Sequence, residues 1–368
     1  MEKQVVKWGN VLKFAGAFIA FLIGAGFATG QEIMQYFASY GYEGLLTALV
    51  MLILFVYVGG EFIVTGYNEK FEKGSEIFGY YCGKYIGAFY DYFTIAFVFM
   101  SYVVMIAGAG ATLNQHYGLP NYVGGIGMMC LAALTVTAGL GKIVDIIGRI
   151  GPAIVLISVG LGLYAIFSNF GDISKNAEMI QNNEIELLRA GKNWFISASS
   201  YVGFCMLWLA AFLAAVGKEA NSRKEAFLGT TVGAVGFSAG CVALMLGLLA
   251  YLPEVAGQQI PSLILAVKIN PAIATVFSVI IVSGIYTTAV PLLWQPTARF
   301  TVEGSKKFKI LAVGLAILGC FIGLTLPYNK LLNIIYVING YVGILLLVFI
   351  VAKSVRRKAE ASKKKEAA

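Results

Sequence analysis

Long apolar stretches separated by short polar connections make up nearly the whole chain. Each stretch is long enough to form a helix that crosses the hydrocarbon core of a bilayer, which takes about 20 residues. We expect ten such helices, at roughly 11–38, 44–66, 88–113, 121–139, 147–168, 193–216, 226–251, 271–298, 308–325 and 330–352. The pattern therefore predicts an all-α, polytopic membrane protein without a separate soluble domain.

The longest polar connection divides the chain near its middle. We expect a first group of five helices in 1–168, an external connecting segment in 169–192, a second group of five in 193–352 and a basic cytoplasmic tail in 353–368. Asp172, Glu178, Glu184 and Glu186 make the connecting segment polar, and it is predicted to hold a short amphipathic surface helix.

The positive charges test this topology. Of the 27 lysines and arginines, those on one side of the predicted bundle are Lys175, Arg189, Lys192, Lys268 and Lys330. All the others fall in the termini and in the connections of the opposite side. Because cytoplasmic segments are enriched in lysine and arginine, the bias predicts that both termini are cytoplasmic and that the protein lies in the cell inner membrane. The formal charge of +8 then reflects topology and contact with the lipid bilayer, with no nucleic-acid partner.

Composition narrows the function classes further. Hydrophobic residues make up 59% of the chain and charged residues 12%, against about 25% charged residues in soluble domains. The only histidine is His116, and the five cysteines are scattered singly. No catalytic triad, metal cluster or nucleotide-binding fingerprint is present, so we expect neither an enzyme nor a bound cofactor.

Two of the predicted helices contain weak stretches. The segment 11–38 carries Gly24, Gly26 and Gly30 near its middle, and each glycine costs about 1 kcal/mol in a helix interior. The segment 193–216, which opens the second half, carries small residues from Ser197 to Gly203. Interruptions at matching positions of two halves indicate the binding site of an inverted-repeat transporter. Close helix packing is the alternative explanation for both stretches.

The run Ile23-Gly24-Ala25-Gly26-Phe27-Ala28-Thr29-Gly30-Gln31-Glu32-Ile33 resembles the signature of the YkvI-like membrane proteins. These proteins are assigned as amino-acid permeases to the APC superfamily. The resemblance covers essentially the whole chain. It implies a LeuT-type fold, with two inverted five-helix repeats and with the first and sixth helices broken around a central site.

A substrate site is predicted around these breaks. Glu32 is an ionisable residue in a membrane helix and hence a functional candidate. It would bind a substrate ammonium, ligate Na⁺ or carry a proton; the alternative is a carboxylate that caps a half-helix or reaches external water. Backbone groups and aromatic walls would complete the site, although aromatic residues at helical spacing also serve packing. The predicted substrate-binding residues are Gly24, Gly26, Phe27, Glu32, Tyr102, Phe195, Ser199, Tyr201 and Gly203.

The resemblance also implies a coupling-ion site and a supporting residue. It places Thr287 and Thr288 where sodium-coupled LeuT-type proteins use hydroxyl groups, with backbone carbonyls near Ala20 and Ile23 completing a Na⁺ site. The alternative for both threonines is a hydrogen bond to their own helix turn. The resemblance aligns Glu61 with a glutamate that supports the unwound backbone of the sixth helix.

These features predict a secondary active transporter for a small zwitterionic or neutral solute, with an amino acid as the first choice. Na⁺ coupling is favoured because the segment 147–168 lacks the lysine of some proton-coupled relatives. No lysine or arginine is expected at mid-membrane, which disfavours substrates with several negative charges. A proton-coupled permease acting through Glu32 and a non-transporting solute sensor of the same fold are the alternatives, and monomer and homodimer both stay open.

Overall fold

The computed structural model describes residues 6–139 and 144–366 of the chain, and no strand occurs among them. The helices are α1 (Trp8–Leu22), α2 (Ala25–Thr29), α3 (Gln31–Tyr36), η1 (Ala38–Tyr40), α4 (Glu43–Glu69), α5 (Glu76–Tyr117), α6 (Asn121–Ala138), α7 (Val144–Ser168), α8 (Asp172–Gln181), α9 (Trp194–Gly217), α10 (Arg223–Ala250), α11 (Leu252–Val255), α12 (Pro261–Ile269), α13 (Pro271–Phe300), α14 (Lys306–Gly323) and α15 (Tyr328–Glu366).

All ten predicted segments are helical, but fewer pass a test of length and apolar composition for crossing a membrane. In the described part of the chain seven helices pass, or up to eight if α7 and α8, which are bent by 98° at their junction, count as one span. Helix α1 has 15 residues and is too short alone, because the first segment is broken. The multi-pass membrane character is thus confirmed, and the count of ten crossings stays a prediction. The surface helix expected in 169–192 is present as α8.

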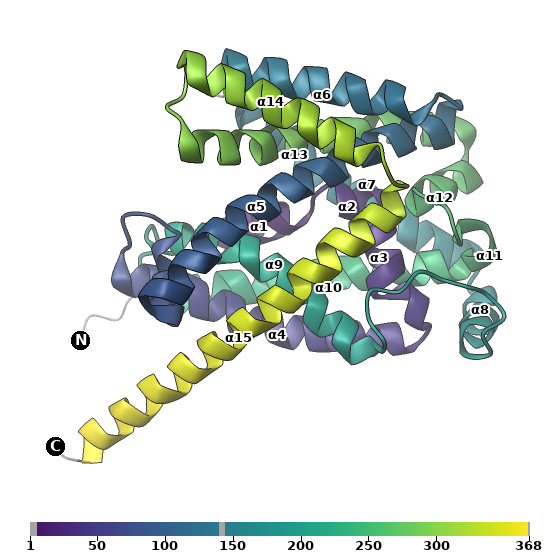
Figure 1. Cartoon of the computed structure of the whole chain (residues 1–368). Coiled ribbons are helices and arrows are strands. Elements are labelled where there is room, and N and C mark those ends of the chain that lie inside the picture. Colours follow the sequence, from purple (N-terminus) through teal and green to yellow (C-terminus); the bar gives the residue numbers. More distant parts are fainter. Residues whose placement is uncertain (1–5, 140–143, 367–368) are drawn as a thin grey trace.

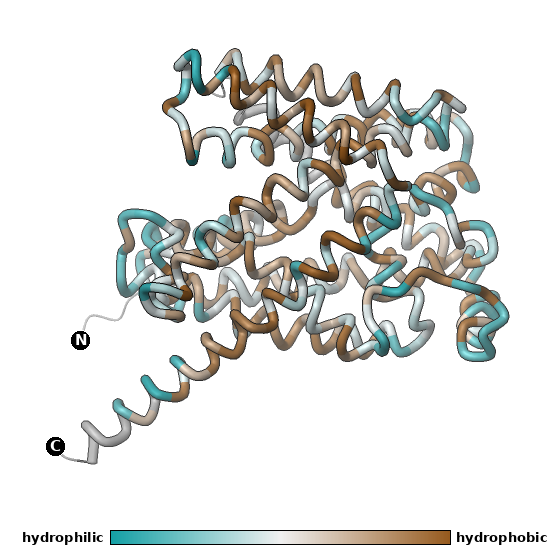
Figure 2. The backbone as a smooth tube through the Cα atoms, viewed as in Figure 1, coloured by the Kyte–Doolittle hydropathy of each residue, from teal (hydrophilic) through white to brown (hydrophobic). Residues whose placement is uncertain are grey.

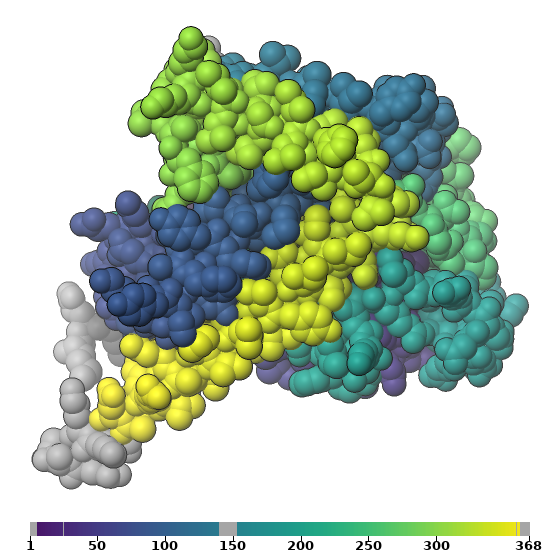
Figure 3. Space-filling model, viewed as in Figure 1, coloured from purple at the N-terminus to yellow at the C-terminus, as the bar shows by residue number. Residues whose placement is uncertain are grey.

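The long helices pack in two groups (Figure 1). The first group is α1, α4, α9 and α10, and the second group is α5, α6, α13 and α14. Helix α7 packs on α10 and α13, and α15 packs on α9 and α5. Figure 3 shows α15 as a continuous ridge beside α5 on the surface of the molecule.

The two ends of the bundle differ in what they carry. Both chain ends lie at one end in Figure 1, and the short helices α8, α11 and α12 lie at the other. We call these the terminal end and the outer end. In Figure 2 hydrophilic residues gather at the two ends, and hydrophobic residues occupy the helices between them. Apolar side chains such as Leu49, Ile53, Val276 and Val279 are exposed along these helices, as expected for contact with lipid.

The expected break in the sixth helix is wrong, because α9 runs without interruption from Trp194 to Gly217. The Asn193 side chain accepts from the Ile196 N–H at 2.9 Å and caps the first turn. Ser199 donates to the Phe195 carbonyl of its own helix at 2.9 Å. Gly203 lets α9 approach α15, since a Cβ there would come within 2.1 Å of the Gly340 carbonyl. The small residues of this stretch therefore serve close packing.

Candidate functional site

The first helix is broken at Ile23 and Gly24, between α1 and α2. Both residues have extended backbone angles. The Gly24 N–H bonds the Leu22 carbonyl at 3.1 Å, whereas in a continuous helix it would bond the carbonyl of Ala20. The break therefore removes the helical partner of the Ala20 carbonyl. A second bend follows at Gly30, whose φ of 76° lies in the left-handed region that favours glycine.

Glu32 folds back from α3 towards α2. Its side chain is buried, and Oε2 accepts a long hydrogen bond of 3.4 Å from the Tyr201 hydroxyl of α9. The carboxylate lies against the α-carbon of Gly26, because a Cβ at Gly26 would come within 1.7 Å of Glu32 Oε1. This close approach explains why glycine is required at position 26.

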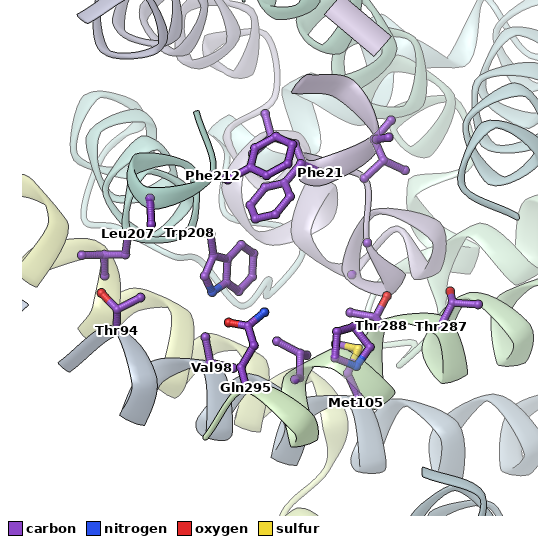
Figure 4. A pocket seen from close by; sticks show the side chains of 18 of the residues that line it. Phe21, Thr94, Val98, Met105, Leu207, Trp208, Phe212, Thr287, Thr288 and Gln295 are labelled. Carbon is purple, nitrogen blue, oxygen red and sulfur yellow. The ribbon is translucent and has the colours of Figure 1, made fainter. Parts of the chain in front are cut away.

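A cavity of about 550 Å³ lies between the two groups of helices and contains Glu32 in its wall. Phe21 of α1 and Phe212 of α9 stack with ring centroids 4.0 Å apart and form one wall (Figure 4). Met105, Thr288 and Gln295 lie across from them. The wall also contains residues of α1, α2 and the break between them, of α5, α9, α13 and α15, and of the α4–α5 connection: Ala20, Ile23, Gly24, Gly26, Lys73, Gly74, Ser75, Thr94, Leu207, Trp208, Ala211, Ala215, Thr287, Pro291 and Tyr336.

The cavity reaches towards the terminal end of the bundle. Lys73, Gly74 and Ser75 line it there, and Lys73 is exposed. Asp91 of α5 and Arg299 of α13 form an ion pair of 2.5 Å about one helical turn from the lining residues Thr94 and Gln295. This pair joins the two helices at the mouth of the cavity.

A network of neutral hydrogen bonds closes the outer end, and we call it the outer seal. Thr29 and Tyr328 join their hydroxyl groups at 3.0 Å, and Ser262 of α12 donates to the Ala28 carbonyl. The Gln31 side chain donates to the Gln258 carbonyl at 3.1 Å. Further bonds of the seal are Gln35 to the Asn329 carbonyl, Asn333 to Gln35, and the reciprocal pair between Gln115 and the backbone of Ile260. The cavity is therefore open towards the terminal end and sealed at the outer end.

The four residues predicted for sodium come together in this cavity. Ala20, Ile23, Thr287 and Thr288 all line it. A Cβ at Gly24 would lie 4.0 Å from the Thr288 hydroxyl oxygen, so α13 faces the break directly. Thr287 and Thr288 each donate to the Gly284 carbonyl at 2.9 Å. Their oxygen lone pairs remain available as ligands after this donation.

Of the predicted substrate-binding residues, Gly24, Gly26 and Glu32 line the cavity. Tyr201 does not line the cavity itself but is linked to it by its hydrogen bond to Glu32. The ring of Phe27 packs on the ring of Phe237, with the ring centroids 5.9 Å apart.

The remaining predicted residues lie elsewhere. The ring of Tyr102 packs on Gly319 of α14, where a Cβ would come within 2.5 Å of it. Phe195 is 54% exposed on the surface, Ser199 bonds its own helix and Gly203 packs on α15. The structure does not bring these four residues to the cavity.

The predicted partner of Glu61, the unwound backbone of the sixth helix, is wrong. Because α9 is continuous, it offers no unwound backbone for this carboxylate. Instead Arg357 Nη2 lies 2.9 Å from both oxygens of Glu61, and the Tyr81 hydroxyl donates to Oε2 at 3.1 Å. Glu61 therefore joins α4 and α5 to the last part of α15.

Several residues of the cavity were missed by the sequence analysis. Trp208 and Tyr336 supply aromatic faces, and the indole N–H of Trp208 is buried and has no hydrogen-bond partner among the described residues. Gln295 supplies an amide near the mouth. Gln295 could have been found as a polar residue beside Pro296 in an apolar helix, whereas the two aromatic residues look like packing residues in the sequence.

In sequence, the chain is similar to two proteins of Bacillus subtilis (strain 168). One is the uncharacterized membrane protein YkvI, with 22% identity over 95% of this chain and 98% of the relative. The other is the uncharacterized protein YyaD, with 27% identity over 93% of this chain and 96% of the relative. The resemblance to YkvI-like proteins is confirmed, while no family model matches the chain.

In structure, the chain is similar to MhsT, solved in complex with L-phenylalanine, with a TM-score of 0.59 and 16% identity over 95% of this chain and 91% of that one. A mutant manganese transporter of Eremococcus coleocola aligns with a TM-score of 0.50 and 12% identity over 96% of this chain and 73% of that one. The likeness to MhsT confirms the LeuT-type fold.

Proposed function

We propose that the chain is a secondary active transporter that moves a small solute with a protonated amino group by alternating access. The observation that carries this proposal is the cavity at the broken first helix, with the buried carboxylate of Glu32 in its wall. The cavity lies between two groups of helices, open at one end and sealed at the other. A transporter that rocks one group against the other around a central site needs this arrangement.

The chemistry of the cavity favours an ammonium group on an apolar body. Glu32 supplies one negative charge, and Phe21, Trp208 and Tyr336 supply apolar and aromatic surface. Aromatic faces also attract cations. The volume of about 550 Å³ falls within the range of small-molecule sites. Amino acids carry an ammonium group, and the fold relative MhsT was solved with L-phenylalanine, so amino acids and related amines are the first classes to test.

Sodium is the first candidate for the coupling ion. The Ala20 carbonyl, which the break leaves without its helical partner, and the hydroxyls of Thr287 and Thr288 are hard oxygen donors around one place in the cavity. Thr287→Ala together with Thr288→Ala is expected to raise the sodium concentration needed for transport roughly tenfold, a loss of about 1.4 kcal/mol. An unchanged sodium requirement would remove this assignment.

A divalent cation is a weaker candidate for the cargo, although one fold relative is a manganese transporter. Divalent cations prefer several hard oxygen ligands, usually including carboxylates. Within the described residues no group of three or more histidine, cysteine, aspartate or glutamate side chains is placed to hold a metal ion. Glu32 is the one carboxylate among the residues that line the cavity.

The experiment that tests the proposal is solute flux in proteoliposomes. Vesicles that contain the reconstituted protein are loaded with an unlabelled amine or amino acid. Uptake of the same solute in radiolabelled form by counterflow is then compared with uptake into vesicles without protein. Counterflow above this background supports the proposal. Saturable binding to the purified protein without any flux would instead identify a solute sensor of the same fold.

We also propose that the terminal end faces the cytoplasm, as the lysine and arginine bias predicts.

A further inference from the structure

Glu32 has no cationic partner in the described part of the protein. Its one side-chain hydrogen bond comes from Tyr201 at 3.4 Å, which is long for a hydroxyl donor. Among the described residues, the titratable groups that interact electrostatically with Glu32 are tyrosines and thiols of α3, α9, α10 and α15: Tyr36, Tyr201, Cys205, Cys241, Tyr328 and Tyr336. Lys73 lines the cavity only at its exposed mouth.

A carboxylate in such surroundings needs one positive charge. Leaving an ionised carboxylate buried and unpaired costs far more than burying a neutral acid or an ion pair. One proton or one ammonium group satisfies Glu32, and the two exclude each other because both occupy the same oxygens. Whichever cation leaves the site must therefore be replaced by the other.

We propose that Glu32 binds a proton and the ammonium group of a monocationic amine in turn, so that the protein exchanges one amine for one proton. This inference rests on the proposed transport function and names its substrate class and a proton exchange at Glu32, in addition to the sodium site proposed at Thr287 and Thr288. When R–NH₃⁺ enters, the O–H bond of protonated Glu32 breaks and the proton passes to water in the cavity. The carboxylate then accepts an N–H of the ammonium group. The reverse step reprotonates Glu32 and releases the amine.

The geometry favours an amine over a zwitterionic amino acid. A substrate carboxylate needs free N–H donors, such as those at the start of a half-helix. At the start of α2 the space against Gly26 is occupied by the carboxylate of Glu32 itself. Helix α9 is continuous and uses its backbone N–H groups internally. With no arginine or lysine deep in the cavity wall, a second carboxylate would face Glu32 without a cationic side chain beside it.

The experiment is isothermal titration calorimetry of the purified full-length protein in sodium-free buffers. The two probes are 2-phenylethylamine and L-phenylalanine, which differ only in the carboxylate. Titrations in two buffers with different ionisation enthalpies give the number of protons released per ligand. Glu32→Gln, which keeps the shape of the side chain and removes its charge, is compared with Glu32→Asp and with Glu219→Gln. Glu219→Gln is the matched control, because it is the same substitution at a glutamate outside the cavity. Glu219 forms an exposed ion pair with Lys13.

We expect the wild-type protein to bind 2-phenylethylamine with release of close to one proton per amine and with weaker apparent affinity at lower pH. Glu32→Gln should weaken amine binding at least roughly tenfold and abolish proton release. Glu32→Asp should keep proton release, and Glu219→Gln should behave as wild type.

Amine binding without proton release, or equal binding by Glu32→Gln, would overturn the exchange. Preferential binding of L-phenylalanine would also overturn it while leaving the proposed transporter in place. Binding of neither probe would contradict both proposals.

Discussion

The outer seal and the helix contacts at the terminal end of this bundle use different chemistry, although the outer end also carries an ion pair between Lys268 of α12 and Glu254 of α11. At the outer end, neutral amides and hydroxyls link α2, α3, α12 and the start of α15 in the outer seal. At the terminal end, the ion pair of Asp91 with Arg299 joins α5 to α13, and the ion pair of Glu61 with Arg357 joins α4 to α15. Between them lies the cavity with Glu32. The outer end is thus closed by several neutral hydrogen bonds, while the cavity opens at the end where ion pairs join the helices.

The largest expected effect comes from filling the space between Gly26 and Glu32. Gly26→Ala places a Cβ within 1.7 Å of Glu32 Oε1, so the flexible carboxylate must move away from α2. We expect ligand binding to weaken roughly 30-fold or more, a loss of about 2 kcal/mol, in a protein that still folds. Calorimetric titration measures this change.

The matched control is Gly16→Ala in α1, because nothing lies within 4 Å of a Cβ at that position. It should bind as wild type. Equal affinities of the two alanine variants would show that Glu32 takes no part in binding.

The next effect concerns the ion pairs of the terminal end. Arg357→Ala leaves the partly buried Glu61 carboxylate with Tyr81 and Ser354 as its partners. The free energy of unfolding should fall by about 1 to 3 kcal/mol, as measured by denaturant titration in detergent. Lys13→Ala, which breaks the exposed pair with Glu219, should cost at most about 0.5 kcal/mol. Equal losses in the two variants would mean that the Glu61 contact is no stronger than a surface pair.

A smaller effect is expected from loosening the outer seal. Tyr328→Phe removes the hydrogen bond to Thr29, which contributes about 1 kcal/mol. We expect hydrogen exchange of the backbone amides around 258–262 and 328–333 to accelerate roughly fivefold, because opening of the seal becomes easier. Mass spectrometry of peptides from these segments measures the rates.

Tyr286→Phe is the control for this experiment. It removes a hydrogen bond of the same kind, away from the seal. This bond joins the hydroxyl groups of Tyr286 in α13 and Thr135 in α6 at 2.7 Å. It should leave exchange in the seal unchanged. Acceleration by both variants would indicate general destabilisation.

The smallest effect should follow from Ser199→Ala in α9. The hydroxyl bonds the Phe195 carbonyl of its own helix and does not reach the cavity. Ligand affinity should therefore change less than about twofold, since the lost bond is local and replaceable. A tenfold loss in titration calorimetry would restore Ser199 to the binding site and would contradict the continuous α9.

The sequence predicted the helices and the first break for clear physical reasons. Apolar length defines a membrane helix, and Gly24, Gly26 and Gly30 weaken one helix enough to break it. In the structure a Cβ at Gly26 would clash with Glu32, and Gly30 has a left-handed backbone angle, while Gly24 is extended at the break itself. The buried Glu32 was found because a carboxylate is conspicuous in an apolar helix.

The second break and the partner of Glu61 were not predictable in the same way. Small residues allow either an unwound backbone or close helix packing, and for Gly203 the choice depends on Gly340 and Gly343, which lie far along the chain. The partner of Glu61 depends on where α15 passes, so the sequence alone did not point to Arg357. Aromatic lining residues such as Trp208 and Tyr336 look the same in sequence as packing residues.

The proposed transport by alternating access depends on the side of the membrane from which the cavity is reached. Ala20 lines the cavity beside the break, and Lys268 lies on α12 at the outer end. In a cysteine-free background, Ala20→Cys and Lys268→Cys are labelled with a membrane-impermeant maleimide in right-side-out and inside-out vesicles. We expect Ala20→Cys to react only from the side of the chain termini and Lys268→Cys only from the opposite side. We also expect 2-phenylethylamine to slow the labelling of Ala20→Cys. Labelling of Ala20→Cys from the Lys268 side, with no protection by the amine, would contradict a cavity that opens at the terminal end and binds the amine.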